Sequence, residues 1–285
     1  MQIARFDLGG QARWGVVRDE TVSVVDSALE SVMDSGLDGV LAVGTEPGGA
    51  EVSLADVELL SPVNRPSKLI GVGLNYRDHA EESGFAIPDS PVIFGILPSA
   101  IVGPHDPIEL PTESTQVDWE AELGVVIGKV ARNVSPGEAL NYVLGYTIVH
   151  DVSARDLQIT EGQWTRAKSF DSFKPVGPWI TTADKLGDAS GLAIRLWVNS
   201  ELMQESNTSE LIVGVPDLIS FLSGTCTLLP GDLIMTGTPA GVGMAHQPPQ
   251  FLREGDEVSI EIEGIGMLSN PVTRAAYIAL DSEGT

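Results

Sequence analysis

The chain has 285 residues, of which 42% are hydrophobic, and 40 acidic against 16 basic residues give a formal net charge of −24 at pH 7. A surface of this sign repels nucleic acid and anionic membranes, so we expect neither as a partner. The sequence has no apolar run long enough to cross a membrane and no secretory pattern at its start, and Cys226 has no second cysteine to pair with. These features predict a cytoplasmic protein.

Residues 1–65 predict a small amino-terminal domain rich in β-structure. Three short runs have the alternation of strands and are separated by turn signals: residues 2–6, Ala12–Arg18 and Thr21–Val25. The pattern does not decide between helix and strand over 27–34 and 52–60. No chemically reactive cluster occurs here, so we expect this domain to serve in packing or assembly and assign the function to residues 66–285.

A short helix is predicted over residues 75–83, after a strand at 68–73. Asn75 is a suitable N-cap and Gly84 a suitable stop, because glycine readily adopts the left-handed conformation that ends helices. On this helix His79 and Glu82 are three residues apart, which places them side by side. Taken alone, the pattern favours an ordinary surface pair of His and Glu over a functional one.

The segment 118–128 predicts a strand with an acidic face. Acidic and apolar residues alternate along it, namely Asp118, Glu120 and Glu122 against Trp119, Ala121 and Leu123. Side chains of a strand alternate between its faces, so the carboxylates point the same way. Neighbouring carboxylates repel, and a buried unpaired charge is costly, so this face is either solvated or in contact with a cation. Residues 256–264 show the same alternation without a further acid and serve as an internal comparison.

The apolar run 143–150 predicts a buried strand that delivers Asp151 at its end. Together, Glu120, Glu122 and Asp151 would form a site made of oxygen ligands alone. Such a site suits Mg²⁺ or Mn²⁺, with Ca²⁺ as a further candidate, better than zinc.

Two residues beyond Asp151 extend this prediction. Arg155 and Gln158 follow it by four and seven residues and would share its face if the segment is helical. His150 points to the opposite side of the strand, so we expect it in the core.

The rest of the chain contains one long segment without clear periodicity, residues 161–179, which holds Lys168 among aromatic residues. Long ordered loops in compact domains are often functional. Further strands are predicted at 91–94, 192–199 and 256–264, and a helix at 215–223. The glycines of 237–243 would let the backbone approach a ligand closely, but their spacing does not match Gly-x-Gly-x-x-Gly, so we reject a dinucleotide loop.

Five of these segments, in order between about residues 66 and 275, resemble the motifs of the fumarylacetoacetate hydrolase family. They are Asn75-Tyr-Arg-Asp-His-Ala-Glu-Glu82, Asp118-x-Glu-x-Glu-Leu123, His150-Asp-x-Ser-x-Arg-Asp-x-Gln158, Lys168-Ser-Phe-Asp-Ser-Phe173 and Thr236-Gly-Thr-Pro-x-Gly-Val-Gly243. The resemblance implies a mostly β fold with short helices (α+β), a mixed β-sandwich roll preceded by the small amino-terminal domain. It also implies a homodimer.

The same resemblance implies roles for ten residues. Glu120, Glu122 and Asp151 would bind the metal, His79, Glu82 and Lys168 would be catalytic, and Tyr76, Arg155, Gln158 and Thr238 would bind substrate. In the family the 75–82 segment acts as a lid whose His and Glu activate a water. The implied reaction is hydrolysis of a carbon–carbon bond in an acylpyruvate or another 1,3-diketo acid, through a metal-stabilised enolate.

Other functions stay open at this point. The same site would serve decarboxylation of oxaloacetate or isomerisation of an oxo-acid, neither of which needs water as the nucleophile. The presence of both His79 and Glu82 favours the hydrolase. The sequence does not identify the acyl group.

One departure from the family pattern prompts a third function of a different class, a non-catalytic protein that binds a small molecule. Family members commonly have Phe-x-Lys where this chain has Phe94-Gly-Ile96. If that lysine contacts substrate, Ile96 makes the pocket more apolar. Alternatively, Ile96 faces the core, or Arg77 or Lys174 supplies the missing charge.

Overall fold

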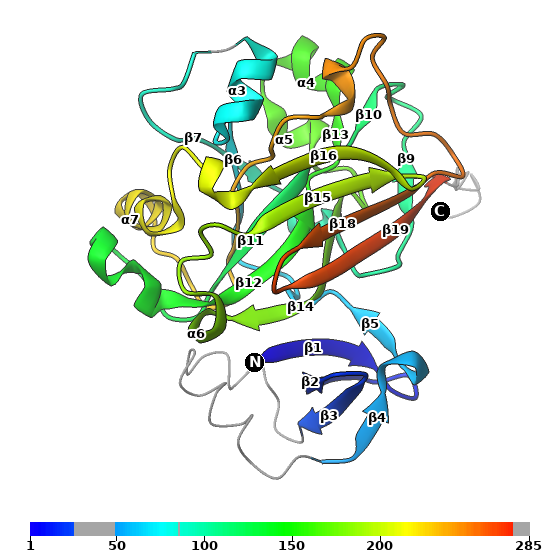
Figure 1. Ribbon diagram of the computed structural model, residues 1–285, viewed down its shortest axis with the longest axis vertical. Helices are drawn as coiled ribbons and strands as arrows, with labels where there is room; N and C mark the ends of the chain where they lie inside the picture. Colours follow the sequence, from blue (N-terminus) through cyan, green and yellow to red (C-terminus); the bar gives the residue numbers. More distant parts are fainter. Residues whose placement is uncertain (26–48, 85, 276–285) are drawn as a thin grey trace, which may run out of the picture.

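The computed structural model of the protein describes residues 1–25, 49–84 and 86–275, and the described part is built mainly from strands (Figure 1). Twelve strands form one mixed sheet in the order β4-β3-β2-β1-β14-β12-β11-β17-β6-β7, with β5 beside β1 and β8 beside β14. These strands are β1 (Gln2–Asp7), β2 (Ala12–Arg18), β3 (Thr21–Val25), β4 (Glu51–Ser53), β5 (Glu58–Leu60), β6 (Leu69–Gly73), β7 (Val92–Ile96), β8 (Ile101–Val102), β11 (Ala121–Ile127), β12 (Val143–His150), β14 (Lys174–Thr182) and β17 (Leu233–Met235).

A second sheet of five strands covers one face of the first, and two short strands form a third sheet. The second sheet has the order β16-β15-β18-β19-β9, and β10 pairs with β13. Their bounds are β9 (Ile108–Leu110), β10 (Val117–Asp118), β13 (Ser153–Ala154), β15 (Ala193–Val198), β16 (Glu201–Asn207), β18 (Glu257–Ile262) and β19 (Gly266–Arg274). The described α-helices are α3 (Arg77–Ser83), α4 (Arg155–Glu161), α5 (Trp164–Ala167), α6 (Ala183–Leu186) and α7 (Val215–Thr225). The described 3-10 helices are η1 (Leu54–Asp56), η2 (Pro98–Ala100), η3 (Pro136–Tyr142), η4 (Thr208–Glu210) and η5 (Gly243–Ala245).

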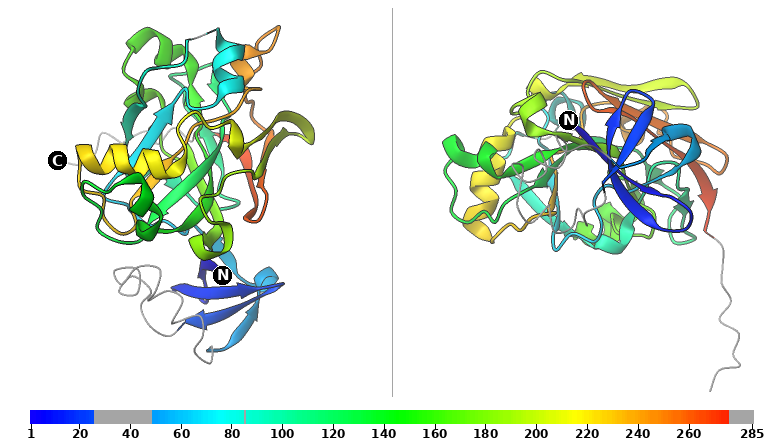
Figure 2. Two further views of the ribbon diagram at one scale, coloured as in Figure 1. Left: turned by 60° about the vertical axis from the view of Figure 1, so that its left-hand side comes forward. Right: turned by 90° about the horizontal axis from the view of Figure 1, so that it is seen from below.

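The amino-terminal strands form a lobe that continues the large sheet. The predicted strands are present as β1, β2 and β3, while 52–60 becomes β4, η1 and β5, and 27–34 lies outside the described residues. Strand β1 pairs with β14 through Ile3 and Ile180. The lobe lies at the opposite end of the molecule from α3 and α4 (Figures 1 and 2). The boundary near residue 65 stays a prediction.

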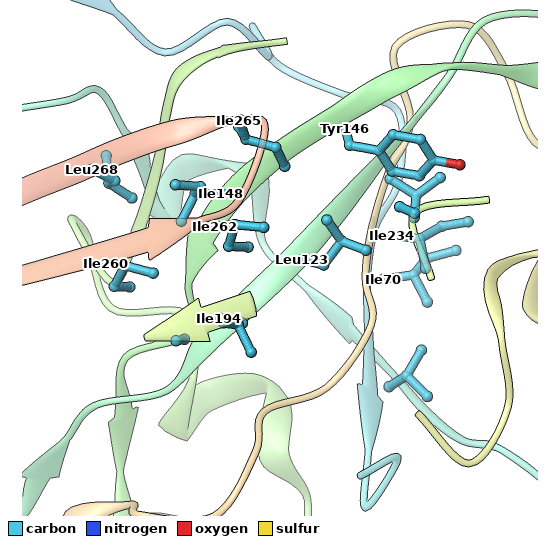
Figure 3. Packing of buried hydrophobic residues seen from close by; sticks show 14 of the residues in the cluster. Ile70, Leu123, Tyr146, Ile148, Ile194, Ile234, Ile260, Ile262, Ile265 and Leu268 are labelled. Carbon is cyan, nitrogen blue, oxygen red and sulfur yellow. The ribbon is translucent and has the colours of Figure 1, made fainter. Parts of the chain in front are cut away.

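The main core lies between the two larger sheets. Leu123 of β11 and Ile148 of β12 are fully buried there with Ile194, Ile260 and Ile262 of the second sheet (Figure 3). A separate cluster covers the other face of the same central strands. Because β11 and β12 are buried on both faces, acidic residues at their ends are held away from water. A solvated acidic face is therefore ruled out for β11.

The predicted single strand over 118–128 is wrong in one respect, because the chain changes sheets within it. Strand β10 ends at Asp118 and pairs with β13, whereas β11 begins at Ala121 and pairs with β12. A second segment makes the same change: β12 of the large sheet ends at His150, and β13 of the two-stranded sheet begins at Ser153. Glu120 and Asp151 lie at these two crossings, where the Asp151 N–H donates to the Glu120 carbonyl at 2.9 Å.

Two other predictions need correction. Asn75 is not the cap of α3: its amide donates to the carbonyls of Val213 and Thr236, so Tyr76 precedes the helix instead. Residues 161–179 are not largely irregular, since they include the last residue of α4, all of α5 and the first six residues of β14, which pairs with β12. The stop at Gly84 is confirmed, with φ of +66°.

The remaining predicted elements agree with the structure. Strands β6, β7, β15 and β18 and helix α7 lie where the sequence predicts them, within one to three residues at each end. In the described residues no helix is long and apolar enough to span a membrane.

Candidate active site

A cavity of about 560 Å³ opens at the end of the molecule that carries α3, α4 and α5. Nine of the ten predicted site residues line it, and Tyr76 does not. No described residue of the amino-terminal lobe takes part in its wall. The structure therefore brings together residues that are up to 159 positions apart in the chain, between His79 and Thr238.

Three buried carboxylates form the floor of the cavity. Oxygens of Glu120, Glu122 and Asp151 lie within 4.8 Å of one another, and the residues are 5%, 2% and 0% exposed. Burial raises the pKa of Glu122 well above its usual value, and the charges of Asp151 and Glu120 raise it further. Its one described hydrogen bond donor is the Gly237 N–H, at 2.7 Å from Oε2.

Lys168 and Arg155 neutralise part of this charge. Lys168 Nζ lies 2.8 Å from Glu120 Oε2 and 2.7 Å from Asp151 Oδ2. Arg155 Nη2 lies 2.6 Å from the other Glu120 oxygen. Burial opposes ionisation of Glu120, but these two cations outweigh it and hold its pKa below the usual value. Burial also opposes ionisation of Lys168 and would lower its pKa. The negative charges of Asp151 and Glu120 outweigh burial, so the pKa of Lys168 is raised.

Asp118 belongs to a different set of contacts from the other acids of its segment. Its Oδ2 lies 2.8 Å from Arg155 Nε and accepts the Met244 N–H at 3.1 Å, and its Oδ1 accepts the Gly243 N–H at 2.6 Å. Asp118 is thus fully occupied in fixing Arg155 and the 237–243 loop. Gln158 accepts from Arg155 Nη1 at 2.9 Å and completes this arrangement.

The site fits a hard divalent cation. Its buried groups comprise the carboxylates of Asp118, Glu120, Glu122 and Asp151 and the cations Arg155, Lys168 and Lys174, which leaves one net negative charge when every group is ionised. Within the described residues Glu122 forms no ion pair with a lysine or arginine, although it lines the cavity. An all-oxygen donor set with excess negative charge is what Mg²⁺ and Mn²⁺ require.

Helix α3 is attached over the cavity by its polar side chains. His79 Nδ1 lies 3.4 Å from Glu82 Oε2, so the predicted pair is present. Glu82 Oε1 accepts the Gly241 N–H at 2.9 Å, and Asp78 Oδ2 accepts the Ser206 hydroxyl at 2.5 Å. A helix of two turns has little stability of its own, so these contacts hold it in place.

The glycine loop contacts acidic side chains of the site, and the predicted close approach of its backbone to a ligand stays a prediction. Its N–H groups at Gly237, Gly241 and Gly243 donate to carboxylates of the protein, those of Glu122, Glu82 and Asp118. Gly241 has φ of +99°, and a Cβ there would lie 2.0 Å from the Met203 carbonyl oxygen, so no other residue fits. The loop thus positions acidic groups of the site.

Three residues singled out in the sequence lie outside the cavity wall. Tyr76 is fully buried, its hydroxyl has no hydrogen-bond partner in the described residues, and burial and the nearby Glu122 raise its pKa. Burial lowers the pKa of His150 to about 3, so this histidine is a neutral core residue. The interpretation of Ile96 as a pocket residue is wrong: it is 5% exposed and belongs to the core cluster that includes Leu69 and Met235.

The sequence analysis missed the apolar part of the cavity wall. Phe94 and Trp164 meet edge to face with centroids 5.2 Å apart, and Lys168 Nζ lies 5.3 Å from the Phe94 centroid. Ile159 and Met244 also line the cavity and are 65% and 39% exposed, which places them at its mouth. The available signal for Phe94 was the alternation of side chains along β7, which places Phe94 and Ile96 on one face. Of these two residues, only Phe94 reaches the cavity.

Comparisons with known proteins identify the family of the chain. Residues 68–273 match the family model described as fumarylacetoacetate (FAA) hydrolase, C-terminal, and residues 1–62 match one described as Rv2993c-like, N-terminal. Oxaloacetate tautomerase Fahd2a, mitochondrial, of Rattus norvegicus is 48% identical over 219 residues, which cover 76% of this chain and 70% of the relative.

Solved structures of the same fold include a hydrolase and an isomerase. The maleylpyruvate hydrolase of Sphingobium sp. SYK-6, solved with manganese(II) and pyruvate, is 33% identical with a TM-score of 0.81 and covers 97% of this chain and 100% of its own. The 5-carboxymethyl-2-hydroxymuconate delta-isomerase of Mycobacterium smegmatis is 37% identical with a TM-score of 0.81, over 96% of this chain and 100% of its own.

Proposed function

The chain belongs to the fumarylacetoacetate hydrolase family, and from this premise we propose that it hydrolyses a carbon–carbon bond of an acylpyruvate or related 1,3-diketo acid. The observation that carries the proposal is the His79–Glu82 pair in the wall of the cavity whose floor is the acidic triad. A base oriented by a carboxylate is what activation of water requires, and hydrolysis is the reaction of this family that consumes water.

Glu120, Glu122 and Asp151 would hold Mg²⁺ or Mn²⁺, which supplies Lewis acidity toward the keto and carboxylate oxygens of the substrate. Lys168, in the same floor, would stabilise negative charge that develops on the pyruvate part. Arg155 and Gln158 form the adjoining wall and would orient the substrate carboxylate together with Thr238.

His79 would remove the proton from water. Glu82 lies beside Nδ1 and would keep the proton on that nitrogen, so that Nε2 accepts the proton of the attacking water. The water oxygen bonds to the distal carbonyl carbon, and the carbon–carbon bond breaks with its electron pair on the pyruvate carbon. That carbon then takes up a proton, which gives pyruvate and a carboxylic acid.

We further propose that the acyl end of the substrate is apolar. Phe94, Trp164, Ile159 and Met244 supply the outer wall, whereas the cations of the wall, Arg155 and Lys168, are paired with carboxylates of the protein. A second carboxylate on the substrate would therefore lack a counterion in the described wall.

Release of pyruvate from a panel of acylpyruvates tests the proposal. We expect turnover with Mg²⁺ or Mn²⁺, loss of turnover with excess chelator and recovery when the metal is restored. Apolar monoanions such as acetylpyruvate or hexanoylpyruvate should be better substrates than fumarylpyruvate. Absence of pyruvate release from every member in the presence of metal would contradict hydrolysis.

Tautomerisation or decarboxylation of oxaloacetate is the second candidate. It is supported by the rat relative, whose name assigns it oxaloacetate tautomerase activity. Following enol–keto conversion of oxaloacetate by ultraviolet absorbance separates this candidate from hydrolysis. The alternative of a non-catalytic binding protein was based on Ile96 as a pocket residue. Ile96 lies in the core, so this alternative is no longer supported. Assembly as a homodimer stays a proposal, as does the cytoplasmic location, since the rat relative's name places that protein in mitochondria.

A further inference from the structure

A second buried lysine lies behind the floor of the cavity. Lys174 is the first residue of β14, its side chain is fully buried, and it is absent from the cavity wall. It is one of five lysines in a chain with a net charge of −24. A buried ammonium is costly unless fully paired, so its surroundings indicate what it serves.

Lys174 contacts the triad through one carboxylate. Its Nζ lies 2.9 Å from Asp151 Oδ1 and donates to the carbonyls of Val152 at 3.0 Å and Phe173 at 2.8 Å. The ammonium group therefore donates two hydrogen bonds to backbone carbonyls and forms an ion pair with Asp151, and Lys174 does not line the cavity where a substrate would bind. Asp151 lies between two lysines, because its Oδ2 is 2.7 Å from Lys168 Nζ on the cavity side.

The difference between the two lysines is one of position. Lys168 faces the cavity and would meet the substrate, whereas Lys174 reaches the cavity only through Asp151. Lys174 thus adds a fixed positive charge that substrate cannot displace. With it the buried cluster carries a net charge of −1, and a bound divalent cation would bring the total to +1. Without it the same loaded site would be neutral.

We propose that Lys174 is a positioning residue that fixes Asp151 and sets the charge of the metal site, so that the loaded site is positive and retains an anionic substrate. This role rests on the proposed function in requiring a divalent cation and a pyruvate-type anion. It carries a cost, because a cation behind Asp151 weakens the attraction of the triad for the metal. Lys174 therefore lowers the affinity of the site for the metal and raises the affinity of the loaded site for an anion.

Lys174→Met tests this exchange, because methionine keeps the length and removes the charge. Calorimetric titration with Mn²⁺ alone at pH 7 should show binding that is about tenfold tighter or more in the variant. Titration of the Mn²⁺-loaded variant with pyruvate should show binding weaker by about the same factor. A merely structural role would weaken both, so the opposite signs identify the charge effect.

Lys185→Met is the matched control, since it removes one positive charge from the exposed end of α6 and should change neither affinity. Lys174→Gln serves as a second variant if Lys174→Met folds poorly. Mn²⁺ should then raise the melting temperature of the variant more than that of the wild type, because the metal binds the more negative site more tightly. Variants that remain unfolded with Mn²⁺ would assign Lys174 to the fold alone and overturn the proposal.

The other outcomes are distinct. Unchanged or weaker Mn²⁺ binding in a folded Lys174 variant overturns the role of Lys174 and leaves the proposed function intact. Failure of Mn²⁺ to bind the wild type overturns both. If Mn²⁺ binds but pyruvate does not bind the wild type, the proposed substrate class fails, and the Mn²⁺ comparison still decides whether Lys174 weakens metal binding.

Discussion

Two strands of this protein have the same acidic alternation and opposite environments. In β18 the apolar residues Val258, Ile260 and Ile262 are buried, while the side chain of Glu261 is 44% exposed and pairs with Arg195, itself exposed. At β11 the corresponding acids, Glu120 and Glu122, are almost fully buried. Alternation alone therefore predicts which residues share a face, and the neighbouring elements decide whether that face is wet.

The difference arises from what lies across each strand. Strands β11 and β12 are covered on both faces. The polypeptide passes from one sheet to another beside each of these strands, at Glu120 and at Asp151, and this brings the two acids together. Strand β18 is covered on one face only and has no acid-bearing crossing beside it. A cation site thus requires convergence of carboxylates under burial, and the predictions below test that requirement.

Asp151→Asn should have the largest effect. Removal of one of three carboxylates lowers the attraction for the cation, so we expect Mn²⁺ affinity to fall by about 100-fold or more and activity to be lost, while the fold is kept. Calorimetric titration and circular dichroism measure the two. Glu261→Gln on β18 is the matched control and should change neither. Unchanged Mn²⁺ affinity in Asp151→Asn would remove the acidic triad as the metal site.

His79→Ala should reduce hydrolysis by about 10²- to 10⁴-fold, the usual contribution of a general base, and leave Mn²⁺ affinity unchanged. Decarboxylation of oxaloacetate should be spared, since it needs no activated water. Pyruvate release and oxaloacetate loss are measured on the same preparations, with His105→Ala, an exposed turn residue, as the control. Equal loss of both activities would show that His79 positions the substrate.

Glu122→Gln should stabilise the metal-free protein at pH 7, by about 1 to 3 kcal/mol. The pKa of Glu122 is raised on folding, so the stability that its protonated form contributes is complete below the usual value of 4.5 and is lost as the pH rises through the folded value. The advantage of the variant should therefore shrink on acidification toward pH 4.5. Urea unfolding at several pH values measures it, and a pH-independent difference would contradict the raised pKa of Glu122 in the folded, metal-free protein.

Much of this site follows from the sequence, because the signals are local. The spacing of Glu120 and Glu122 in extended chain and of His79 and Glu82 on one helix predicts each pair before any tertiary contact is known. Asp151 could be expected at the site because a buried strand ends at it, whereas the role of Lys168 could be expected only by resemblance to a family. The chain crossing between sheets left no local signal, so the strand was predicted without its break.

The sequence could not predict how far along a strand the cavity ends, or on which side of a carboxylate a lysine lies. Phe94 and Ile96 share a face of β7, yet one lines the cavity and the other lies two residues deeper in the core. Lys174 follows the Lys168 motif closely, but only the register of β14 against β12 turns it to the far side of Asp151. Such distinctions depend on tertiary register.

Ile159→Lys should have the smallest effect, because it places a charge at an exposed position, at the mouth of the cavity. Ile159 is 65% exposed on α4 and lines the cavity, so a lysine there is tolerated and adds a cation at the apolar wall. We expect the ratio of kcat/KM for fumarylpyruvate over hexanoylpyruvate to rise by about two- to fivefold, because an exposed charge pair contributes about 1 kcal/mol or less. Leu202→Lys on β16 is the matched control, since Leu202 is also exposed, at 45%, and lies outside the cavity wall. The increase should fade at high salt, where exposed charges are screened. An equal ratio in wild type and Ile159→Lys, with Leu202→Lys also unchanged, would show that the distal end of the substrate does not reach the apolar wall at Ile159.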